Sequence, residues 1–371
     1  MKIFFFHPFI VDKRLQVTSK NEFARGVSQL GHSIDTVVGY ERLKIPLSGF
    51  STVKFIPVKT SLGKVFLYSK TIRTLFNSSY DCTIVSNSVA WALPFIYLRN
   101  RLSSNRIKVV SDIRTIPVDE TRFFVKSLKI LKFRIELVLI DFFSDGLSVI
   151  TEATKEEVRP YISRINHICV WGSGVNLSQF ELDKKDRIHR ENELSTRIIY
   201  HGHVSKERGL DTLIQGCILA QEKVRDIELV IIGSGPYFEF LETSTIGHTW
   251  IKILRPVPYT QIQQYLINSH IGIVPLSDLK WWRLSSPLKL MEYIAADLFI
   301  IASDIRSHQE MKESFQDIQL FEASNEVELS NKIIEAIKSL KEGHLPLYQD
   351  KGEIDWKAKA AVLLRYIEEI D

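Results

Sequence analysis

Residues 1–38 read MKIFFFHPFIVDKRLQVTSKNEFARGVSQLGHSIDTVV, and this stretch decides the fold class. It begins with a continuous apolar segment, Lys2–Phe6, which predicts a buried strand. Ser19-Lys20-Asn21-Glu22 is typical of a capping box, in which a serine and a glutamate bond the first free amides of a helix. Gly31 is expected to end that helix, and residues 33–38 return as a second strand. A strand, a helix and a strand at this spacing predict a parallel sheet with right-handed crossovers.

The same alternation recurs along the chain, which makes the fold class α/β. Further strands are expected at residues 82–86, 108–112, 146–151, 197–201, 229–232, 270–275 and 299–303. A chain of 371 residues is too long for one ordinary core. We therefore expect two Rossmann-like domains with parallel sheets. Their boundaries are predicted as residues 1–175 and 197–350, with an interdomain linker at 176–196 and a closing helix at 351–371.

The composition excludes several classes of protein. Three scattered cysteines, Cys82, Cys169 and Cys217, form no CxxC pair, so neither a disulfide framework nor a zinc site is expected. No uncharged apolar run reaches the roughly 18 residues that a membrane span requires. The apolar N-terminus lacks the basic segment of a signal peptide, and we interpret it as a strand. The chain is therefore expected in the cytoplasm, and nucleic acid is not an expected partner.

Charge is distributed unevenly between the two halves. Residues 1–180 hold 25 Lys and Arg against 14 Asp and Glu, a net charge of +11, whereas residues 181–371 carry −7. A basic half suggests that one domain faces an anionic surface or acceptor. Drift of surface charge explains the same numbers equally well.

Residues 123–143 predict one long helix with a heptad-like apolar row. The row consists of Phe124, Leu128, Leu131, Ile135, Val138 and Phe142. Lys126, Lys129 and Lys132 occupy another side. The favoured interpretation is a helix whose apolar row faces the core and whose basic face is solvated. The alternative is a peripheral contact with an anionic membrane, in which basic and apolar side chains share the interface.

Three clusters in the second half follow predicted strands, at the edge where open parallel sheets bind ligands. The first is Tyr-His-Gly-His-Val-Ser-Lys-Glu-Arg-Gly at 200–209, whose imidazoles and cations can neutralise a diphosphate near Gly202. The second is Gly233-Ser234-Gly235-Pro236, where glycines permit a tight turn and close approach of a ligand. A solvated loop explains the first cluster and a plain turn the second.

The third cluster, at residues 281–293, is more specific. Ser285 or Ser286 is expected to cap a helix that carries Pro287 in its first turn. A helix N-terminus favours a phosphate, because it carries partial positive charge and free N–H groups. Lys289 adds a full charge, and Glu292 on the same face can accept two ribose hydroxyls. A capped amphipathic helix with a Lys–Glu pair is the alternative.

These motifs, in this order, resemble the GT-B glycosyltransferases of family 4, also called glycosyl transferases group 1. The similarity covers Gly-x5-Arg-Gly-Leu-Asp-Thr-Leu-Ile at 202–214, the Gly-Ser-Gly-Pro turn, Val257-Pro258-Tyr259, residues 272–275, and Ser-Ser-Pro-Leu-Lys-Leu-Met-Glu-Tyr at 285–293. Residues 171–180 resemble the domain junction of that family. The likeness spans nearly all of 165–310 and is thinner before it. It implies two Rossmann-like domains that face a central cleft, with the donor on the C-terminal domain and the acceptor on the N-terminal one.

The resemblance implies roles for matching positions. Arg208 stands where the family has a lysine that grips the donor diphosphate, and His203 where it has an arginine. Glu292 matches the second glutamate of the Glu-x7-Glu motif, which holds the ribose. Leu284 replaces the first glutamate of that motif, and Asp278 is a candidate substitute.

The N-terminal half departs further from the family pattern. The glycine-rich loop after the first strand is replaced by His-Pro-Phe-Ile at 7–10. Asp112 is the candidate for the histidine that the family often has near the acceptor.

The implied function is transfer of a sugar from a nucleotide-sugar donor to a glycan or lipid-linked acceptor, with retention, in cell-surface polysaccharide biosynthesis. The implied catalytic residues are Arg208, Lys289 and Asp112; the implied donor-binding residues are Gly202, His203, Gly233, Gly235, Ser285, Ser286 and Glu292. Neither a metal nor another cofactor is implied, and the inner face of the plasma membrane is the implied working place. Two alternatives stay open: a sugar-nucleotide epimerase of the same architecture, and an inactive scaffold paralogue. The second is kept because Leu284 replaces the first glutamate of the Glu-x7-Glu motif.

Overall fold

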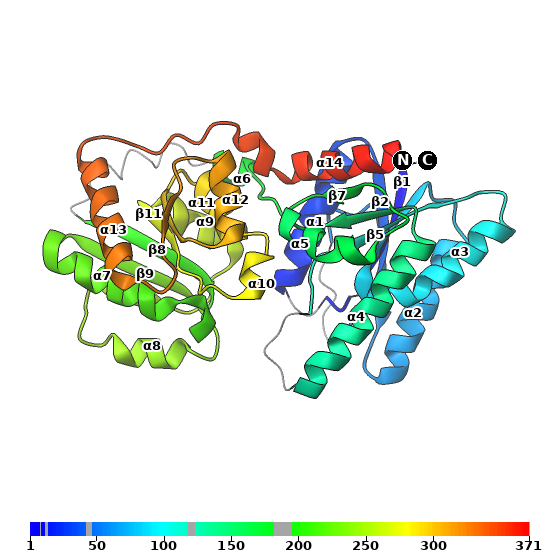
Figure 1. Ribbon diagram of the computed structural model, residues 1–371, viewed down its shortest axis with the longest axis horizontal. Coiled ribbons are helices and arrows are strands. Elements are labelled where there is room, and N and C mark those ends of the chain that lie inside the picture. The colour runs from blue at the N-terminus through cyan, green and yellow to red at the C-terminus, as the bar shows by residue number, and fades with distance from the viewer. Residues whose placement is uncertain (8, 12–13, 42–46, 118–122, 182–194, 371) are drawn as a thin grey trace. The chain divides into compact units, whose positions relative to one another are not determined.

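The computed structural model describes residues 1–7, 9–11, 14–41, 47–117, 123–181 and 195–370. The chain divides into two compact units. Unit 1 comprises Met1–Gly174 and Glu353–Asp371, and unit 2 comprises Val175–Gly352. Figure 1 shows a sheet covered by helices in each unit. Most of the predicted linker, residues 182–194, lies outside the described residues.

Unit 1 contains a seven-stranded sheet in the order β3-β2-β1-β4-β5-β6-β7, and all its paired strands are parallel. The strands are β1 (Lys2–Phe6), β2 (Ser33–Tyr40), β3 (Thr52–Pro57), β4 (Cys82–Ser86), β5 (Lys108–Ile113), β6 (Gly146–Val149) and β7 (Ile168–Val170). The prediction of a parallel sheet from residues 1–38 is confirmed. The edge strands β3 and β7 were not predicted.

Helices cover both faces of this sheet. They are α1 (Arg14–Gln29), α2 (Ser61–Phe76), α3 (Leu93–Leu102), α4 (Phe123–Phe143), α5 (Glu152–Val158) and α14 (Trp356–Glu369), with the short 3-10 turns η1 (Asn87–Ala92) and η2 (Arg159–Tyr161). On one face, α2, α3 and α4 contribute Leu67, Ile96 and Leu137 to a core that includes Phe4. On the other face, α1 and α14 pack over Ile3. Both faces are buried, which explains why β1 is a continuous apolar run.

Helix α1 begins earlier than the capping box predicted. Ser19 and Glu22 lie inside the helix, which already starts at Arg14, so that expectation was wrong. The residues between Arg14 and Ser19 include good helix formers and no helix breaker, so nothing delays the start until the serine. Gly31 ends the helix as predicted, with a φ of 81° that suits glycine.

Helix α4 has the predicted bounds, but the apolar row that was expected to face the core faces solvent instead. Phe133, Leu137 and Ile140 face the sheet. The predicted core row is exposed instead: Leu128 is 67% exposed, Leu131 55%, Ile135 54%, Val138 53% and Phe142 56%. The side chain of Phe124 lies outside the described residues. The helix carries a second apolar row at a spacing of three and four residues, on its opposite side, and this second row packs against the sheet. The core-facing interpretation was therefore wrong.

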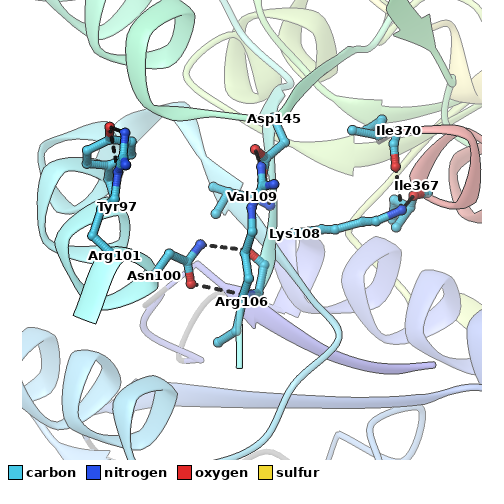
Figure 2. A network of polar contacts seen from close by, with 10 residues as sticks. Tyr97, Asn100, Arg101, Arg106, Lys108, Val109, Asp145, Ile367 and Ile370 are labelled. Atoms are coloured by element: carbon cyan, nitrogen blue, oxygen red, sulfur yellow. Dashed lines mark hydrogen bonds and ion pairs between the residues drawn. The ribbon is translucent and has the colours of Figure 1, made fainter. Parts of the chain in front are cut away.

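Helix α14 returns the chain to unit 1 after the whole of unit 2. Lys108 at the start of β5 donates from Nζ to the backbone carbonyls of Ile367, at 3.2 Å, and Ile370 (Figure 2). A cation at a helix C-terminus binds carbonyls that have no partner inside the helix. The Tyr366 hydroxyl accepts from the amide of Leu147 at 3.0 Å and thereby ties the helix to β6.

Unit 2 contains a six-stranded parallel sheet in the order β10-β9-β8-β11-β12-β13. Its strands are β8 (Thr196–His203), β9 (Ile227–Ser234), β10 (Ile251–Leu254), β11 (Ile271–Val274), β12 (Phe299–Ser303) and β13 (Gln319–Phe321). The four predicted strands correspond to β8, β9, β11 and β12, and the edge strands β10 and β13 were not predicted. The expected two Rossmann-like halves are confirmed.

The helices of unit 2 cover both faces of its sheet. They are α6 (Ser178–Glu181), α7 (Leu210–Val224), α8 (Phe238–Ser244), α9 (Tyr259–Ile267), α10 (Lys280–Arg283), α11 (Leu288–Ala295), α12 (Arg306–Ser314) and α13 (Glu326–Lys341), with the 3-10 turns η4 (Lys206–Arg208) and η5 (Lys351–Ile354). Helices α7 and α13 share the core over one face. Helix α11 lies close against the sheet, because a Cβ on Gly272 of β11 would lie 2.4 Å from the Tyr293 ring. Within the described residues, no helix is both long and apolar enough to cross a membrane.

Candidate functional site

Glycines bring backbone segments close together at the carboxyl edge of the unit 2 sheet, the edge where open parallel sheets bind ligands. A Cβ on Gly233 would lie 1.8 Å from the carbonyl oxygen of Gly202 in the neighbouring strand. A Cβ on Gly235 would lie 2.1 Å from the carbonyl oxygen of Val204. Gly233 and Gly235 are therefore required by backbone packing, whether or not a ligand is bound.

The side chain of Lys289 reaches from α11 over this glycine edge. Gly202 has a φ of 123°, and a Cβ on it would lie 2.9 Å from Cε and 3.1 Å from Nζ of Lys289. The absence of a side chain at position 202 therefore lets the amine occupy this place. Burial, and then the positive charge of Arg208, lowers the pKa of Lys289 to about 7, against a smaller opposing effect of Glu292. An anion at this position would restore the charge of the amine.

Arg208 supplies the second cation of the site. Its guanidinium lies over the Trp282 ring, 4.0 Å from the ring centre. Its Nε is buried and has no hydrogen-bond partner among the described residues. Gly209 follows with a φ of 68°, and a Cβ there would lie 1.8 Å from the carbonyl oxygen of Pro275. The turn that carries Arg208 is thereby packed against the end of β11.

Glu292 is buried one turn after Lys289, and its two carboxylate oxygens have different neighbours. Oε1 accepts a hydrogen bond from the Tyr259 hydroxyl at 2.8 Å. Oε2 lies 3.1 Å from Nε2 of His201, close enough for an ion pair, although this nitrogen makes no well-angled hydrogen bond to any residue that the structure describes. Burial raises the pKa of Glu292, but His201, Tyr259 and Lys289 together outweigh that effect and hold this pKa below its usual value. The carboxylate is therefore ionised and held in one orientation.

Two contacts of this site were not among the predicted site residues. His201 and Tyr259 both contact Glu292, whereas the predicted His203 has an exposed side chain at the end of β8. The signal that could have pointed to His201 is its position inside a buried strand, where a histidine needs a polar partner. Tyr259 lies in the Val257-Pro258-Tyr259 motif, which carried a resemblance but no role.

The start of α11 differs from the predicted serine cap. The N-cap of this helix is Pro287, which has no capping side chain, and the helix begins at Leu288. The Ser285 hydroxyl donates instead to the carbonyl of Trp282 at 2.9 Å, because it closes the preceding turn after α10. The expectation that Ser285 or Ser286 caps the helix was therefore wrong. Both serines still precede the helix, and their contact with a donor stays a prediction.

The position of the missing glutamate is apolar and covered. Leu284 is buried. Asp278, the candidate substitute, is held by two hydrogen bonds from Arg283, at 2.5 and 2.6 Å. The Asp278 side chain is 43% exposed and keeps further lone pairs, so its role as a substitute stays a prediction.

Asp112 lies in unit 1, at the carboxyl end of β5. It is 4% exposed, and its Oδ1 accepts from the Ser148 hydroxyl at 2.8 Å and from Nε1 of Trp171 at 3.1 Å. Arg114 covers the Trp171 ring at 4.1 Å and donates to the Trp171 carbonyl at 2.8 Å. Asp112 is thus in contact with Trp171 and Arg114 rather than with solvent.

Comparison with known families gives a match for unit 2. Residues 195–339 match the family described as Glycosyl transferases group 1. The match contains Gly202, Arg208, Lys289 and Glu292 of the unit 2 site, whereas Asp112 of unit 1 lies outside it. A search with the sequence finds no significant match among curated proteins.

Solved structures resemble the whole chain in fold. Sucrose-phosphate synthase from Thermosynechococcus elongatus has a TM-score of 0.70 at 14% identity, over 100% of this chain and 98% of that one. HepE from Anabaena, solved in complex with UDP, has a TM-score of 0.65 at 16% identity, over 100% and 97%. The lipopolysaccharide outer core galactosyltransferase WaaB, in its apo form, has a TM-score of 0.60 at 16% identity, over 99% of both chains. At these identities the likeness shows the fold, and the expected GT-B class is confirmed.

Proposed function

We propose that the protein is a glycosyltransferase that moves a sugar from a nucleotide-sugar donor bound to unit 2. The observation that supports this most directly is the pairing of Lys289 and Arg208 at the glycine edge, with the ionised Glu292 one turn away. Two neighbouring cations fit a multiply charged anion such as a diphosphate. Burial lowers the pKa of one of them, Lys289, and a bound anion would raise it again. A buried carboxylate beside them fits the hydroxyl groups of a ribose.

The two cations would act mainly on the leaving group. As the bond between the sugar and the diphosphate breaks, negative charge grows on the diphosphate oxygens, and cations already in place stabilise that charge without reorganising. Ser285 and Ser286, which precede α11, and the side chain of His203 are proposed to add further polar contacts to the donor. We propose that this electrostatic clamp serves in place of a metal ion.

The finer assignments also belong to the proposal. We assign the chain to family 4 with retention of anomeric configuration, on the resemblance of residues 285–293, and we expect a hexosyl group to be transferred. With retention, the leaving phosphate itself can take the proton of the acceptor. Asp112 would act on an acceptor through Trp171 and Arg114, the side chains that it holds, and would therefore be a positioning residue.

The acceptor is proposed to be a glycan or a lipid-linked oligosaccharide in cell-surface polysaccharide synthesis. The excess of positive charge in residues 1–180, +11, supports an anionic surface as the working place, and we propose the inner face of the plasma membrane.

Calorimetric titration with UDP, GDP, dTDP and their sugars tests the donor site, and product analysis tests the reaction. We expect one nucleotide series to bind, and the sugar donor to be hydrolysed slowly when no acceptor is present. An isomerised nucleotide-sugar would show an epimerase, and binding without turnover would show an inactive scaffold. If no nucleotide binds, the proposed function is wrong.

A further inference from the structure

The outer surface of the helices α2, α3 and α4 is strongly apolar. Large side chains stand in solvent on each helix: Leu62, Val65 and Phe66 of α2, Phe95, Leu98 and Leu102 of α3, and Leu128, Leu131, Ile135, Val138 and Phe142 of α4. Single exposed apolar side chains are ordinary, but a contiguous group marks a surface that binds something. We call the outer side of these three helices the apolar layer.

The three helices form one continuous layer. All of them pack on the same face of the unit 1 sheet through one core (Figure 1). Tyr68 of α2 meets Trp91 of η1 with ring centres 5.4 Å apart, and Tyr97 of α3 meets Phe143 of α4 at 5.4 Å. These contacts connect α2 through η1, and α3 directly, to the rest of the layer.

The three helices of the apolar layer also carry many positively charged side chains. The three helices carry nine Lys and Arg, of which Arg99 alone is buried. Their two carboxylates, Glu136 and Asp141, are both buried. Glu136 accepts from Asn87 at 3.0 Å, and Asp141 accepts from the amide of Arg164 at 2.8 Å. The negative charges of these helices are thus turned inward, whereas nearly all of the positive charges face outward.

Apolar side chains among outward cations fit the interface of an anionic lipid bilayer, where the chains enter the hydrocarbon and the cations meet the headgroups. A hollow of about 220 Å³ lies between η1 and α4, and its lining is mostly apolar, with the Lys132–Glu136 pair at its side. Its apolar part offers room for an acyl chain. A second copy of the chain fits less well. A two-fold interface would place this surface against itself and bring like charges together.

We propose that the apolar layer docks on an anionic bilayer, with the exposed row of α4 inserted between headgroups. The inference deepens the proposed function and rests on it in one respect, because docking would bring the enzyme to a lipid-linked acceptor. Docking itself needs neither donor nor turnover, so it can be measured separately.

Vesicle flotation with the full chain tests the proposal. We expect the protein to bind vesicles of phosphatidylcholine mixed with phosphatidylglycerol, and to bind vesicles of phosphatidylcholine alone far more weakly. The triple variant Leu131→Gln, Ile135→Gln, Val138→Gln should lower the partition coefficient about 30-fold, because each side chain is only about half exposed and loses about half of the transfer free energy of a fully buried one. All three are exposed, so the fold should tolerate the change.

The matched control is the triple variant Ile246→Gln, Val327→Gln, Val362→Gln, which changes exposed side chains outside the apolar layer. It should bind vesicles like the wild type. Equal binding by the α4 variant and the wild type would overturn the proposal, as would a wild type that ignores anionic vesicles.

Light scattering decides the remaining alternative. If the wild type is a dimer and the α4 variant a monomer, the layer binds a second copy and the proposal is wrong. Calorimetry with UDP, GDP and dTDP is run on the same samples. Vesicle binding without binding of any nucleotide would contradict the proposed function alone, and nucleotide binding without vesicle binding would contradict the docking alone.

Discussion

Helices α4 and α11 both depart from the rule that apolar side chains point inward and charged ones outward, but in opposite senses. Helix α4 turns Leu131 and Ile135 to solvent and buries Glu136. Helix α11 buries Glu292 and holds Lys289 over a backbone glycine. Buried charge is unfavourable without a partner, and exposed apolar area is unfavourable without a cover. This difference supports the two proposals: a small, highly charged ligand at α11 and an extended surface at α4.

The largest effect is expected from the two cations beside α11. Arg208→Ala and Lys289→Ala should each lower kcat/KM. The decrease should correspond to about 2–4 kcal/mol of lost transition-state stabilisation, the scale for removing one preorganised donor. Because both are proposed to share one diphosphate, the double variant should lose less than the sum. Steady-state kinetics of the three variants measure the coupling. Strict additivity, or wild-type rates in either single variant, would show that the two residues do not bind the same diphosphate. The proposed position of the active site would then be wrong.

Glu292→Gln should weaken binding of the nucleoside diphosphate by about 1–3 kcal/mol, since the amide leaves a hydrogen-bond acceptor missing at a buried position. Calorimetry measures the change, and circular dichroism confirms the fold. Glu313→Gln changes a carboxylate on the exposed side of α12 and serves as the control. Unchanged affinity in the Glu292 variant would show that this carboxylate does not bind the donor. Helix α11 would then be an amphipathic helix with a structural Lys–Glu pair.

The affinity for nucleotide should also depend on pH. The pKa of Lys289 is lowered to about 7, so its positive charge is lost as the pH rises through 7. A bound anion raises that pKa, and binding should therefore weaken above pH 7 by at most about tenfold per pH unit. Lys289→Arg keeps its charge and should give a flatter profile. Identical profiles for the variant and the wild type would show that the amine does not titrate on binding.

The smallest effect per residue is expected from the charges of α4. Neutralising Lys126, Lys129 and Lys132 to Gln should lower binding to anionic vesicles by at most about 1 kcal/mol per charge. Lys132 should contribute less than the others, because it lies 3.6 Å from Glu136. High salt should mimic the variant. Vesicle co-sedimentation measures both, and equal binding by the triple variant would leave only the apolar row to explain membrane contact.

Much of the fold could be predicted, because it depends on local patterns. Continuous apolar runs predict the central strands, whereas the short edge strands β3, β7, β10 and β13 carry weaker patterns. The bounds of α4 follow from its sequence, but its orientation does not. Phe133 and Leu137 form one apolar row and Leu131 and Ile135 another, and periodicity does not decide which row meets the sheet.

The site could be predicted where it lies in contiguous sequence. Lys289 and Glu292 lie one turn apart on one helix, so their proximity follows from helix geometry. The contacts of His201 and Tyr259 with Glu292 depend on how β8, α9 and α11 pack, and no local spacing indicates them. The wrong serine cap has the same origin, because Ser285 meets a carbonyl of the preceding turn.

The place of α14 has a consequence for the order of events during synthesis. The helix shares a core with Ile3, Phe23 and Trp171 of unit 1, yet the ribosome makes it after residues 175–352. Unit 2 is contiguous and can complete its fold while α1 covers this face of the unit 1 sheet without α14. The nascent chain therefore exposes apolar surface of unit 1 until α14 emerges, and we expect chains truncated before α14 to aggregate.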